Sequence, residues 1–360
     1  MTRRIAAEEL VRPAYRAMDL YAPLRKPCAI DLSDNTNLRG VPPSAKAALA
    51  DVVGSTVTRY PSLYGAELKR AIGAYVGVDP ENVVTGCGSD DILDSAIRAM
   101  SEPGDAIAFA DPTFQMLSSF ASMNSLEARV VPLLSPERDR DIDDDGLVRE
   151  NARITYVCSP NNPTGSLASP RAIDKLLESA RGVVIVDEAY VEYAIGAGVA
   201  ESLVRRAPTE PRLLVVRTLS KAFGLAGLRV GYAVGPRALV DAVEKSRGPY
   251  KVTAIAERMA VAALDHDREW VRESVAEVLE SRAKFEVFLR EIGRAPLPSA
   301  ANFVLVPIDR AVERGLALRE RGVAVRPFPS VRGVGDALRI SVGPWGLMEQ
   351  TLSTFEAVLA

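Results

Sequence analysis

The alternation of short apolar runs with helical stretches between about residues 44 and 245 constrains the fold of this chain most strongly. The apolar runs are Val83–Thr85, Ala106–Ala110, Ile154–Val157, Val183–Asp187, Leu213–Arg217 and Leu228–Ala233. Between them lie segments such as Asp90–Met100, in which apolar residues recur at helical spacing. Continuous apolar strands separated by helices are typical of a mostly parallel sheet covered on both faces. The sequence therefore predicts an α/β fold.

The pattern changes after about residue 248. The expected elements are a long helix from about Asp267 to Ile292, a strand over Asn302–Ile308, a helix near Ala311–Arg321, a strand over Leu338–Val342 and a final helix. We predict a large α/β domain over residues 41–247 and a smaller α+β domain formed by residues 1–40 and 248–360. The first 40 residues are expected to pack against the smaller unit or against a second subunit.

Composition excludes several classes of protein. The chain has 44 Lys and Arg against 47 Asp and Glu, a net charge of −3, which is unfavourable for nucleic-acid binding. No apolar run reaches the roughly 18 residues of a membrane span, and the N-terminal segment lacks the apolar middle of a signal peptide. Three cysteines in 360 residues do not make a disulfide framework, so we expect a cytoplasmic protein.

The single histidine, His266, limits the available chemistry further. A catalytic triad built on histidine and a zinc site with several histidines are both disfavoured, and we expect no metal. Another group must therefore act as the acid–base catalyst. His266 itself lies in a polar Leu-Asp-His-Asp-Arg segment and is interpreted as a solvated loop residue.

The segment TLSKAFGLAGLR, residues 218–229, follows an apolar run and places hydroxyl groups beside a lysine. Burial in a tight turn of small residues lowers the pKa of an amine and makes Lys221 a nucleophile toward an aldehyde. Thr218, Ser220 and Arg229 are suited to hold a dianionic phosphate. The alternative interpretation of this segment alone is a surface lysine ahead of a helix.

An acid ends the apolar run VVIVD, residues 183–187. Asp187 is therefore expected at the carboxyl end of a buried strand, where open α/β sheets bind their ligands. A buried carboxylate needs a cation or a strong donor, and a pyridinium N–H would satisfy it. Tyr190, three residues on, is within reach of the same site. An acid that caps the next helix is the alternative interpretation.

Two further turns follow strands. The string CSPNNPTG, residues 158–165, forces a rigid turn with asparagine side chains. The string GCGSDD, residues 86–91, joins a strand to a helix and offers the N–H groups of Gly88, Ser89 and Asp90 to an anion, although a simple helix cap is an equal interpretation. Because all four segments follow strands of one sheet, they are expected to meet at one edge.

In combination, SPNNPTG, VDEAY and TLSKAFGLAGLRVG resemble the class I and II aminotransferases, which use pyridoxal phosphate (PLP) and share the aspartate-aminotransferase-like fold. The resemblance covers almost the whole chain and implies a mostly parallel seven-stranded sheet. It implies that Lys221, Asp187 and Tyr190 are catalytic. Lys221 resembles the lysine that bonds to the cofactor aldehyde, and Asp187 resembles the partner of the pyridine nitrogen.

The resemblance also assigns the remaining cofactor contacts. Tyr190 and Asn162 resemble the donors to the phenolic oxygen of PLP, and Phe114 resembles the aromatic residue that stacks on the ring. The residues that resemble the phosphate cradle are Gly88, Ser89, Asp90, Thr218 and Arg229. Tyr60, in Arg-Tyr-Pro, resembles a tyrosine that reaches the phosphate of a neighbouring subunit, so a homodimer is implied.

Within the family, the chain is most similar to the histidinol-phosphate aminotransferases. In that subgroup, arginines like Arg326 and Arg339 bind the substrate phosphate, and Tyr21 resembles a tyrosine that closes the site. A pair of guanidinium groups grips an anion through paired N–H donors, which makes this physically reasonable. A surface arginine at a strand edge is the alternative for Arg339. Asn37 is a further expected substrate contact.

The sequence departs from the family at several points. The usual Asn-Glu-Asn-Pro is replaced by Asn-Thr-Asn-Leu at residues 35–38, Cys87 stands where asparagine is frequent, and the expected stacking residue is phenylalanine rather than tyrosine. Lys251 stands where another asparagine is frequent. Thr36 and Lys251 are expected near the substrate side chain, which makes the substrate less defined than the cofactor.

The expected reaction is a ping-pong transfer of an amino group between a small-molecule amino donor and a 2-oxo acid, with 2-oxoglutarate as the expected acceptor. It requires neither histidine nor metal. Alternatives on the same scaffold are an aromatic amino-acid aminotransferase and a decarboxylase that acts on threonine phosphate. A regulator's effector domain and a nicotinamide-dependent dehydrogenase fit less well, because the chain has no DNA-binding extension and no Gly-x-Gly-x-x-Gly in a first βαβ unit.

Overall fold

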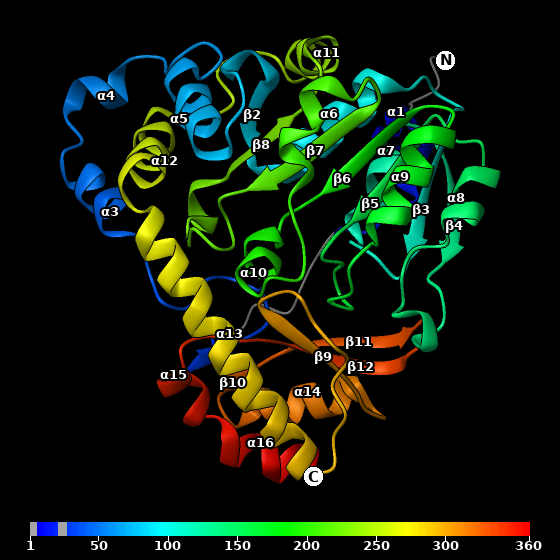
Figure 1. The fold of residues 1–360 in the computed structure, drawn as a ribbon, viewed down its shortest axis with the longest axis vertical. Coiled ribbons are helices and arrows are strands. Elements are labelled where there is room, and N and C mark those ends of the chain that lie inside the picture. The colour runs from blue at the N-terminus through cyan, green and yellow to red at the C-terminus, as the bar shows by residue number, and fades with distance from the viewer. Residues whose placement is uncertain (1–5, 21–26) are drawn as a thin grey trace.

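The computed structural model describes residues 6–20 and 27–360, and its centre is a seven-stranded sheet (Figure 1). The strand order is β2-β8-β7-β6-β5-β3-β4. The strands are β2 Val83–Cys87, β3 Ala106–Asp111, β4 Glu127–Pro132, β5 Ile154–Cys158, β6 Val183–Asp187, β7 Leu213–Thr218 and β8 Val230–Val234. β8 is antiparallel to both of its neighbours, and the pairs among β3 to β7 are parallel. The prediction of a mostly parallel sheet is confirmed.

Both faces of this sheet are buried at its inner strands because these strands are apolar at successive positions. Val184 and Val186 pack into one hydrophobic core, while Ile185 between them packs into the other. The helices that flank the sheet are α5 Ala66–Val76, α6 Gly88–Met100, α7 Met116–Met123, α9 Pro170–Ser179, α11 Arg237–Arg247 and α12 Ala254–His266. A sheet between two helical layers requires strands with apolar side chains on both faces.

A second unit lies below the carboxyl edge of the sheet in Figure 1. The long helix α13 Arg268–Glu291 leads from the first unit into it. Its antiparallel sheet has the order β11-β12-β9, with β9 Phe303–Pro307, β11 Arg326–Val331 and β12 Gly335–Ser341. Its helices are α14 Ala311–Glu320, α15 Trp345–Glu349 and α16 Leu352–Leu359. The division at residues 41–247 stays a prediction from the sequence.

The N-terminal segment contacts both units. The strand β1 Ile30–Asp31 pairs in parallel with β10 Val323–Ala324 of the smaller unit, as expected for the first 40 residues. The short helices α1 Ala7–Leu10 and α2 Pro13–Arg16 lie elsewhere, because α2 packs on α7 and Arg12 donates a hydrogen bond to Ser125. The expectation that this whole segment packs on the smaller unit or a second subunit was therefore incomplete.

Four strands were missed in the sequence: the two-residue strands β1 and β10, and the strands β4 and β11, which lie at sheet edges. β4 carries Glu127 and Arg129 and is exposed along most of its length, so it lacks the apolar run of the inner strands. β11 contains Pro327 and Pro329, which have no N–H group to donate to a neighbouring strand. In a sequence, two such prolines indicate the end of a strand rather than its middle. The remaining short helices are α3 Pro43–Ala50, α4 Gly54–Thr58, α8 Asp144–Arg149 and α10 Val191–Gly196.

No helix in residues 6–20 and 27–360 combines the length and the apolarity that crossing a membrane requires.

A buried ionic cluster joins the ends of β6 and β7. The Arg217 guanidinium donates to a carboxylate oxygen of Glu192 at 2.5 Å, and its Nε lies 3.9 Å from a Glu188 oxygen. All three side chains are nearly inaccessible to water. The guanidinium also lies over the rings of Tyr75 and Tyr232. The cluster fixes the strand ends that carry Asp187 and Thr218.

We predict that Arg217→Leu lowers the free energy of unfolding by about 3–5 kcal/mol, because it leaves two buried carboxylates without their cation. Chemical denaturation measures this change. Arg237→Leu is the matched control, since that arginine pairs with Glu81 at an exposed site and its loss should matter little. Similar small effects of both variants would show that the buried cluster is not stabilising.

Candidate active site

The predicted lysine lies in a turn that leaves β7 at the carboxyl edge of the sheet. Gly224 has φ +68°, and a Cβ there would lie 2.6 Å from the carbonyl oxygen of Gly40, so the turn requires glycine. The Lys221 amine donates a hydrogen bond to the backbone oxygen of Asp34 at 3.1 Å and lies 5.6 Å from the centre of the Tyr190 ring. The lysine therefore points into the protein rather than into solvent.

Enclosure changes the acidity of this amine. Burial lowers the pKa of Lys221 to about 8, and the positive charge of Arg339 acts in the same direction. A fraction of the amine is therefore neutral near pH 7, and the neutral amine is the form that attacks an aldehyde. The interpretation of Lys221 as a surface lysine does not agree with this geometry.

Asp187 ends β6 in the interior, with only 4% of its surface exposed. Its Oδ2 accepts a hydrogen bond from the Tyr156 hydroxyl at 2.9 Å, and its Oδ1 accepts one from the Ala189 N–H at 3.0 Å. Burial raises the pKa of Asp187 to about 6, although the two donors oppose this change. A cationic N–H next to this carboxylate would favour its charged form, as the predicted role requires.

The phosphate loop is built around close contacts that only glycine allows. Gly88 begins α6 with φ +80°, and a Cβ there would lie 2.4 Å from a guanidinium nitrogen of Arg229. A Cβ on Gly231 of β8 would lie 2.3 Å from the backbone nitrogen of Ser89. The two glycines thus bring β8 and its preceding arginine against the first N–H groups of a helix. This is the arrangement that binds anions.

Hydroxyl groups from β7 complete this cradle. Arg229 donates to the Ser220 hydroxyl at 3.3 Å and to a carboxylate oxygen of Asp90 at 3.3 Å. The Thr218 hydroxyl lies 2.9 Å from that of Ser220. The structure thus brings together Gly88, Ser89, Asp90, Thr218, Ser220 and Arg229. Their donors and their one cation fit the phosphate of PLP.

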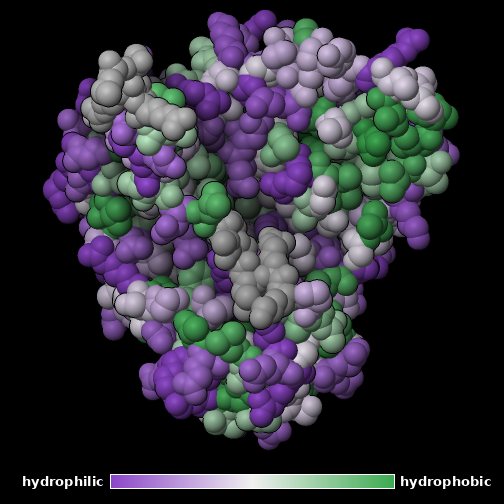
Figure 2. All heavy atoms as spheres, turned by 180° about the vertical axis from the view of Figure 1, so that it is seen from behind, coloured by the Kyte–Doolittle hydropathy of each residue, from purple (hydrophilic) through white to green (hydrophobic). Residues whose placement is uncertain are grey.

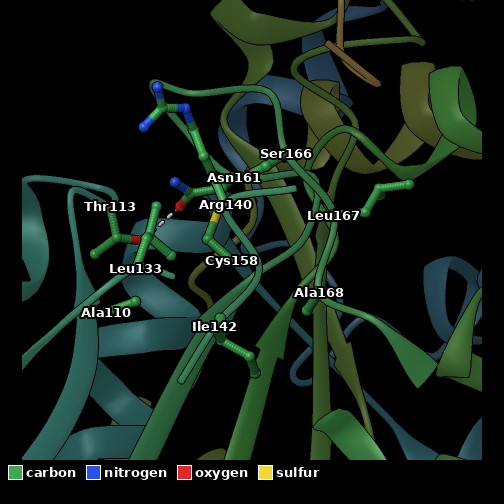
Figure 3. Close-up of a pocket in the computed structure, with 10 residues that line it drawn as sticks. All are labelled: Ala110, Thr113, Leu133, Arg140, Ile142, Cys158, Asn161, Ser166, Leu167 and Ala168. Carbon is green, nitrogen blue, oxygen red and sulfur yellow. Dashed lines mark hydrogen bonds between the residues drawn. The ribbon is translucent and has the colours of Figure 1, made fainter. Parts of the chain in front are cut away.

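The asparagine turn after β5 links both units. Asn161 is buried and acts as a brace, because its amide bonds Pro112 and Thr164 while its carbonyl accepts from Thr113 at 2.9 Å (Figure 3). Asn162 faces the other way and accepts a hydrogen bond from Arg339 at 2.6 Å. Its NH₂ group is the part of the side chain with the donor capacity predicted for the phenolic oxygen of PLP.

The two predicted substrate arginines lie side by side. Arg326 of β11 is directly opposite Arg339 of β12 in the antiparallel pair, which puts both side chains on one face of the sheet. Both line a hollow together with Phe114, Asn162 and Phe328. Arg339 is 8% exposed and also donates to the backbone oxygen of Ser33 at 2.7 Å. It is not the surface arginine of the alternative interpretation.

Asn37 and Lys251, which were predicted near the substrate, bond to other groups, and Tyr60, which was predicted to reach a neighbouring subunit, is exposed. Asn37 donates to the Ala222 carbonyl and the Ser274 hydroxyl, so it supports the lysine turn. Lys251 pairs with Asp91 at 3.4 Å beside the phosphate loop. Tyr60 is 83% exposed and stacks on a neighbouring tyrosine. Tyr21 lies outside the described residues.

Two residues that hydrogen-bond to the candidate site were missed in the sequence. Asn35, two residues before Asn37, donates a hydrogen bond to the Tyr190 hydroxyl at 3.1 Å. Tyr156 contacts Asp187 across two strands. The alternation of side chains along β5 could have pointed to Tyr156, since it shares a face with Cys158 two residues on.

The chain belongs to the aminotransferases of class I and II, whose family model matches residues 28–355. It is 36% identical to histidinol-phosphate aminotransferase 2 of Carboxydothermus hydrogenoformans, over 87% of this chain and 86% of the relative. It is 34% identical to an aromatic amino acid aminotransferase of Mycobacteroides abscessus, over 92% and 94% of the two chains.

A solved structure supports the same conclusion. The histidinol-phosphate aminotransferase of Sinorhizobium meliloti, in complex with pyridoxal 5'-phosphate, aligns with a TM-score of 0.85 at 25% identity and covers 97% of each chain. The predicted aspartate-aminotransferase-like fold, the aminotransferase activity and the PLP cofactor are thereby confirmed. The roles of the individual residues stay predictions, which the geometry above supports.

We predict that Asp187→Asn stabilises the cofactor-free protein at pH 7–8 by about 1–3 kcal/mol, because the raised pKa of Asp187 means that its charged form is unfavourable in the fold. The Asp187 carboxyl loses its proton at a lower pH in the unfolded chain than in the folded protein. The unmodified protein therefore loses stability as the pH rises toward about 6. The gain should vanish near pH 4. Thermal unfolding against pH measures it.

Asp145→Asn, at an exposed site, is the control and should show little change in either range. A difference between Asp187→Asn and the unmodified chain that is the same at pH 4 and pH 8 would contradict the assignment of a buried, strained carboxylate.

Proposed function

We propose that this protein transfers the amino group of histidinol phosphate to 2-oxoglutarate. The observation that carries this proposal is the pair Arg326 and Arg339, placed directly opposite each other in the hollow beside Asn162. Two guanidinium groups suit the phosphate of the donor and, in the second half of the reaction, the carboxylate of the acceptor. The names of the relatives from Carboxydothermus hydrogenoformans and Sinorhizobium meliloti support the same substrate.

In this proposal PLP supplies the ring that accepts an electron pair from the substrate α-carbon. Lys221, with an amine that is partly neutral near pH 7, would take the proton from that carbon and return it to the carbon of the former cofactor aldehyde. Asp187 would hold the ring nitrogen protonated. Tyr190 and Asn162 would donate to the phenolic oxygen, and the cradle around Arg229 would hold the phosphate.

The hollow also supports a second candidate, an aromatic amino-acid aminotransferase. Its lining includes Phe114, Met116 and Phe328 beside the arginines, which is suited to an aromatic side chain. The relative from Mycobacteroides abscessus bears that name. Histidinol phosphate has both an aromatic ring and a dianionic phosphate, whereas phenylalanine and tyrosine have an aromatic ring and a singly charged carboxylate.

We also propose a homodimer in the cytoplasm. Apolar side chains are exposed along one flank over α3 and α4, where Figure 2 shows hydrophobic residues gathered. They are Val41, Leu49, Val53, Val57, Tyr60, Leu63, Tyr64 and Tyr250. Exposed apolar patches of this kind mark protein interfaces. A second copy on this flank would cover them and bring Tyr60 toward a neighbouring site. The free thiols of all three cysteines support a reducing compartment.

We predict that Arg326→Gln lowers kcat/KM for histidinol phosphate by about 10- to 100-fold, because a hydrogen bond to a charged phosphate is lost. The purified enzyme is assayed with histidinol phosphate, phenylalanine, tyrosine and threonine phosphate as donors. Arg310→Gln is the control, since that arginine pairs with Glu313 on the surface of the smaller unit. Turnover of phenylalanine without activity on histidinol phosphate would favour the second candidate.

A further inference from the structure

The Asp187 carboxylate is held by one donor on each oxygen. The Tyr156 hydroxyl bonds Oδ2 and the Ala189 N–H bonds Oδ1, at 2.9 and 3.0 Å. An ionised carboxylate offers about four acceptor positions, so these two bonds fix its plane and leave capacity for a third donor. The backbone bond follows from the turn after β6. The Tyr156 bond comes from a different strand and depends on a side chain.

The pairing of β5 with β6 puts Tyr156 and Asp187 on the same face of the sheet, with Tyr156 two positions before the residue opposite Asp187. Tyr156 is opposite Ile185, and Cys158 is opposite Asp187. The Tyr156 side chain is 1% exposed and its ring packs in the same core as Ile185. Its orientation is therefore set by core packing, which brings the hydroxyl to the Asp187 carboxylate, with the Cys158 thiol as a further neighbour.

The hydroxyl keeps its proton over the whole working range of an enzyme. Burial and the neighbouring negative charge of Asp187 raise the pKa of Tyr156 well above its ordinary value. Burial likewise raises the pKa of the Cys158 thiol, so this neighbour also stays neutral. Tyr156 is thus a neutral hydrogen-bond donor to the carboxylate throughout this pH range. The single histidine of the chain, His266, lies at the end of α12.

Other charges near Asp187 do not replace this donor. The titratable groups that act on it are Tyr156 and Cys158 from β5, Asp90 from α6, Glu188 next in sequence and Tyr190 before α10. Asp90 and Glu188 both raise the pKa of Asp187, which makes its charged form less favourable. The tyrosine hydroxyl is first among the groups that oppose them.

We propose that Tyr156 is a positioning residue, whose hydroxyl holds the Asp187 carboxylate in the orientation and charge state that receive the ring nitrogen of PLP. The proposal rests on the proposed role of Asp187. Without the hydroxyl, the carboxylate loses its side-chain donor and takes up a proton at higher pH. A protonated Asp187 no longer attracts a cationic ring N–H, so the cofactor should bind less tightly.

Tyr156→Phe tests this inference, because it keeps the buried ring and removes only the donor. The full chain, freed of cofactor, is titrated with PLP at several pH values between 5.5 and 8.5, and the dissociation constant is read from tryptophan fluorescence. We expect the constant to rise by about 10-fold or more at pH 7. The pH below which affinity is lost should also move upward. In turnover, kcat should fall while KM for the amino donor changes little.

Tyr193→Phe is the matched control, since it removes another fully buried tyrosine hydroxyl from a helix. It should keep the affinity and pH profile of the unmodified chain. Thermal unfolding of both variants checks that each is folded. An unchanged dissociation constant for Tyr156→Phe, or an equal loss in Tyr193→Phe, would overturn the proposal.

Asp187→Asn separates the proposed role of Tyr156 from the proposed role of Asp187, on which it rests. If Asp187→Asn binds PLP as tightly as the unmodified chain with the same pH profile, the role of Asp187 is wrong and that of Tyr156 falls with it. If Asp187→Asn weakens binding and Tyr156→Phe does not, only the role of Tyr156 is wrong. Weakened binding in both, with the pH profile shifted in Tyr156→Phe, supports both assignments.

Discussion

The structure depends on burying two ionisable groups of opposite charge at one sheet edge. Enclosure lowers the pKa of Lys221 to about 8 and raises that of Asp187 to about 6. Each change moves the group toward its neutral form, and the two groups thereby gain properties that neither has in water. The amine becomes a base and nucleophile near neutrality. The carboxylate becomes unfavourable unless a cationic partner arrives, which ties the energetics of the site to its cofactor.

The fold keeps these groups in place with rigid contacts that themselves carry a cost. Gly88, Gly224 and Gly231 permit backbone approaches that a side chain would prevent. The buried cluster of Arg217 and two glutamates joins the strand ends on either side of the site. The smaller unit then closes the arrangement, because Arg339 reaches across to Asn162. Residues from distant parts of the sequence thus hold the strand ends and the two units together around the site.

The sequence predicted the inner strands and the four turns at their ends, because apolar runs and turn residues are local signals. It did not predict β4 or β11, where edge exposure and prolines remove those signals. It also placed Asn37 at the substrate, whereas the hydrogen bonds assign it to the lysine turn and bring Asn35 to Tyr190. Which of two nearby asparagines faces the site depends on the path of a loop across two units. Spacing within the sequence carries no information on that path.

The central claim is that Lys221 bonds covalently to PLP in the protein as it works. Reduction of the PLP-loaded protein with borohydride, followed by mass spectrometry of its peptides, tests this claim most directly. We expect a pyridoxyl group on Lys221 and its absence in Lys221→Ala. A label on another lysine, such as Lys251 beside the phosphate loop, or no label at all, would contradict the account.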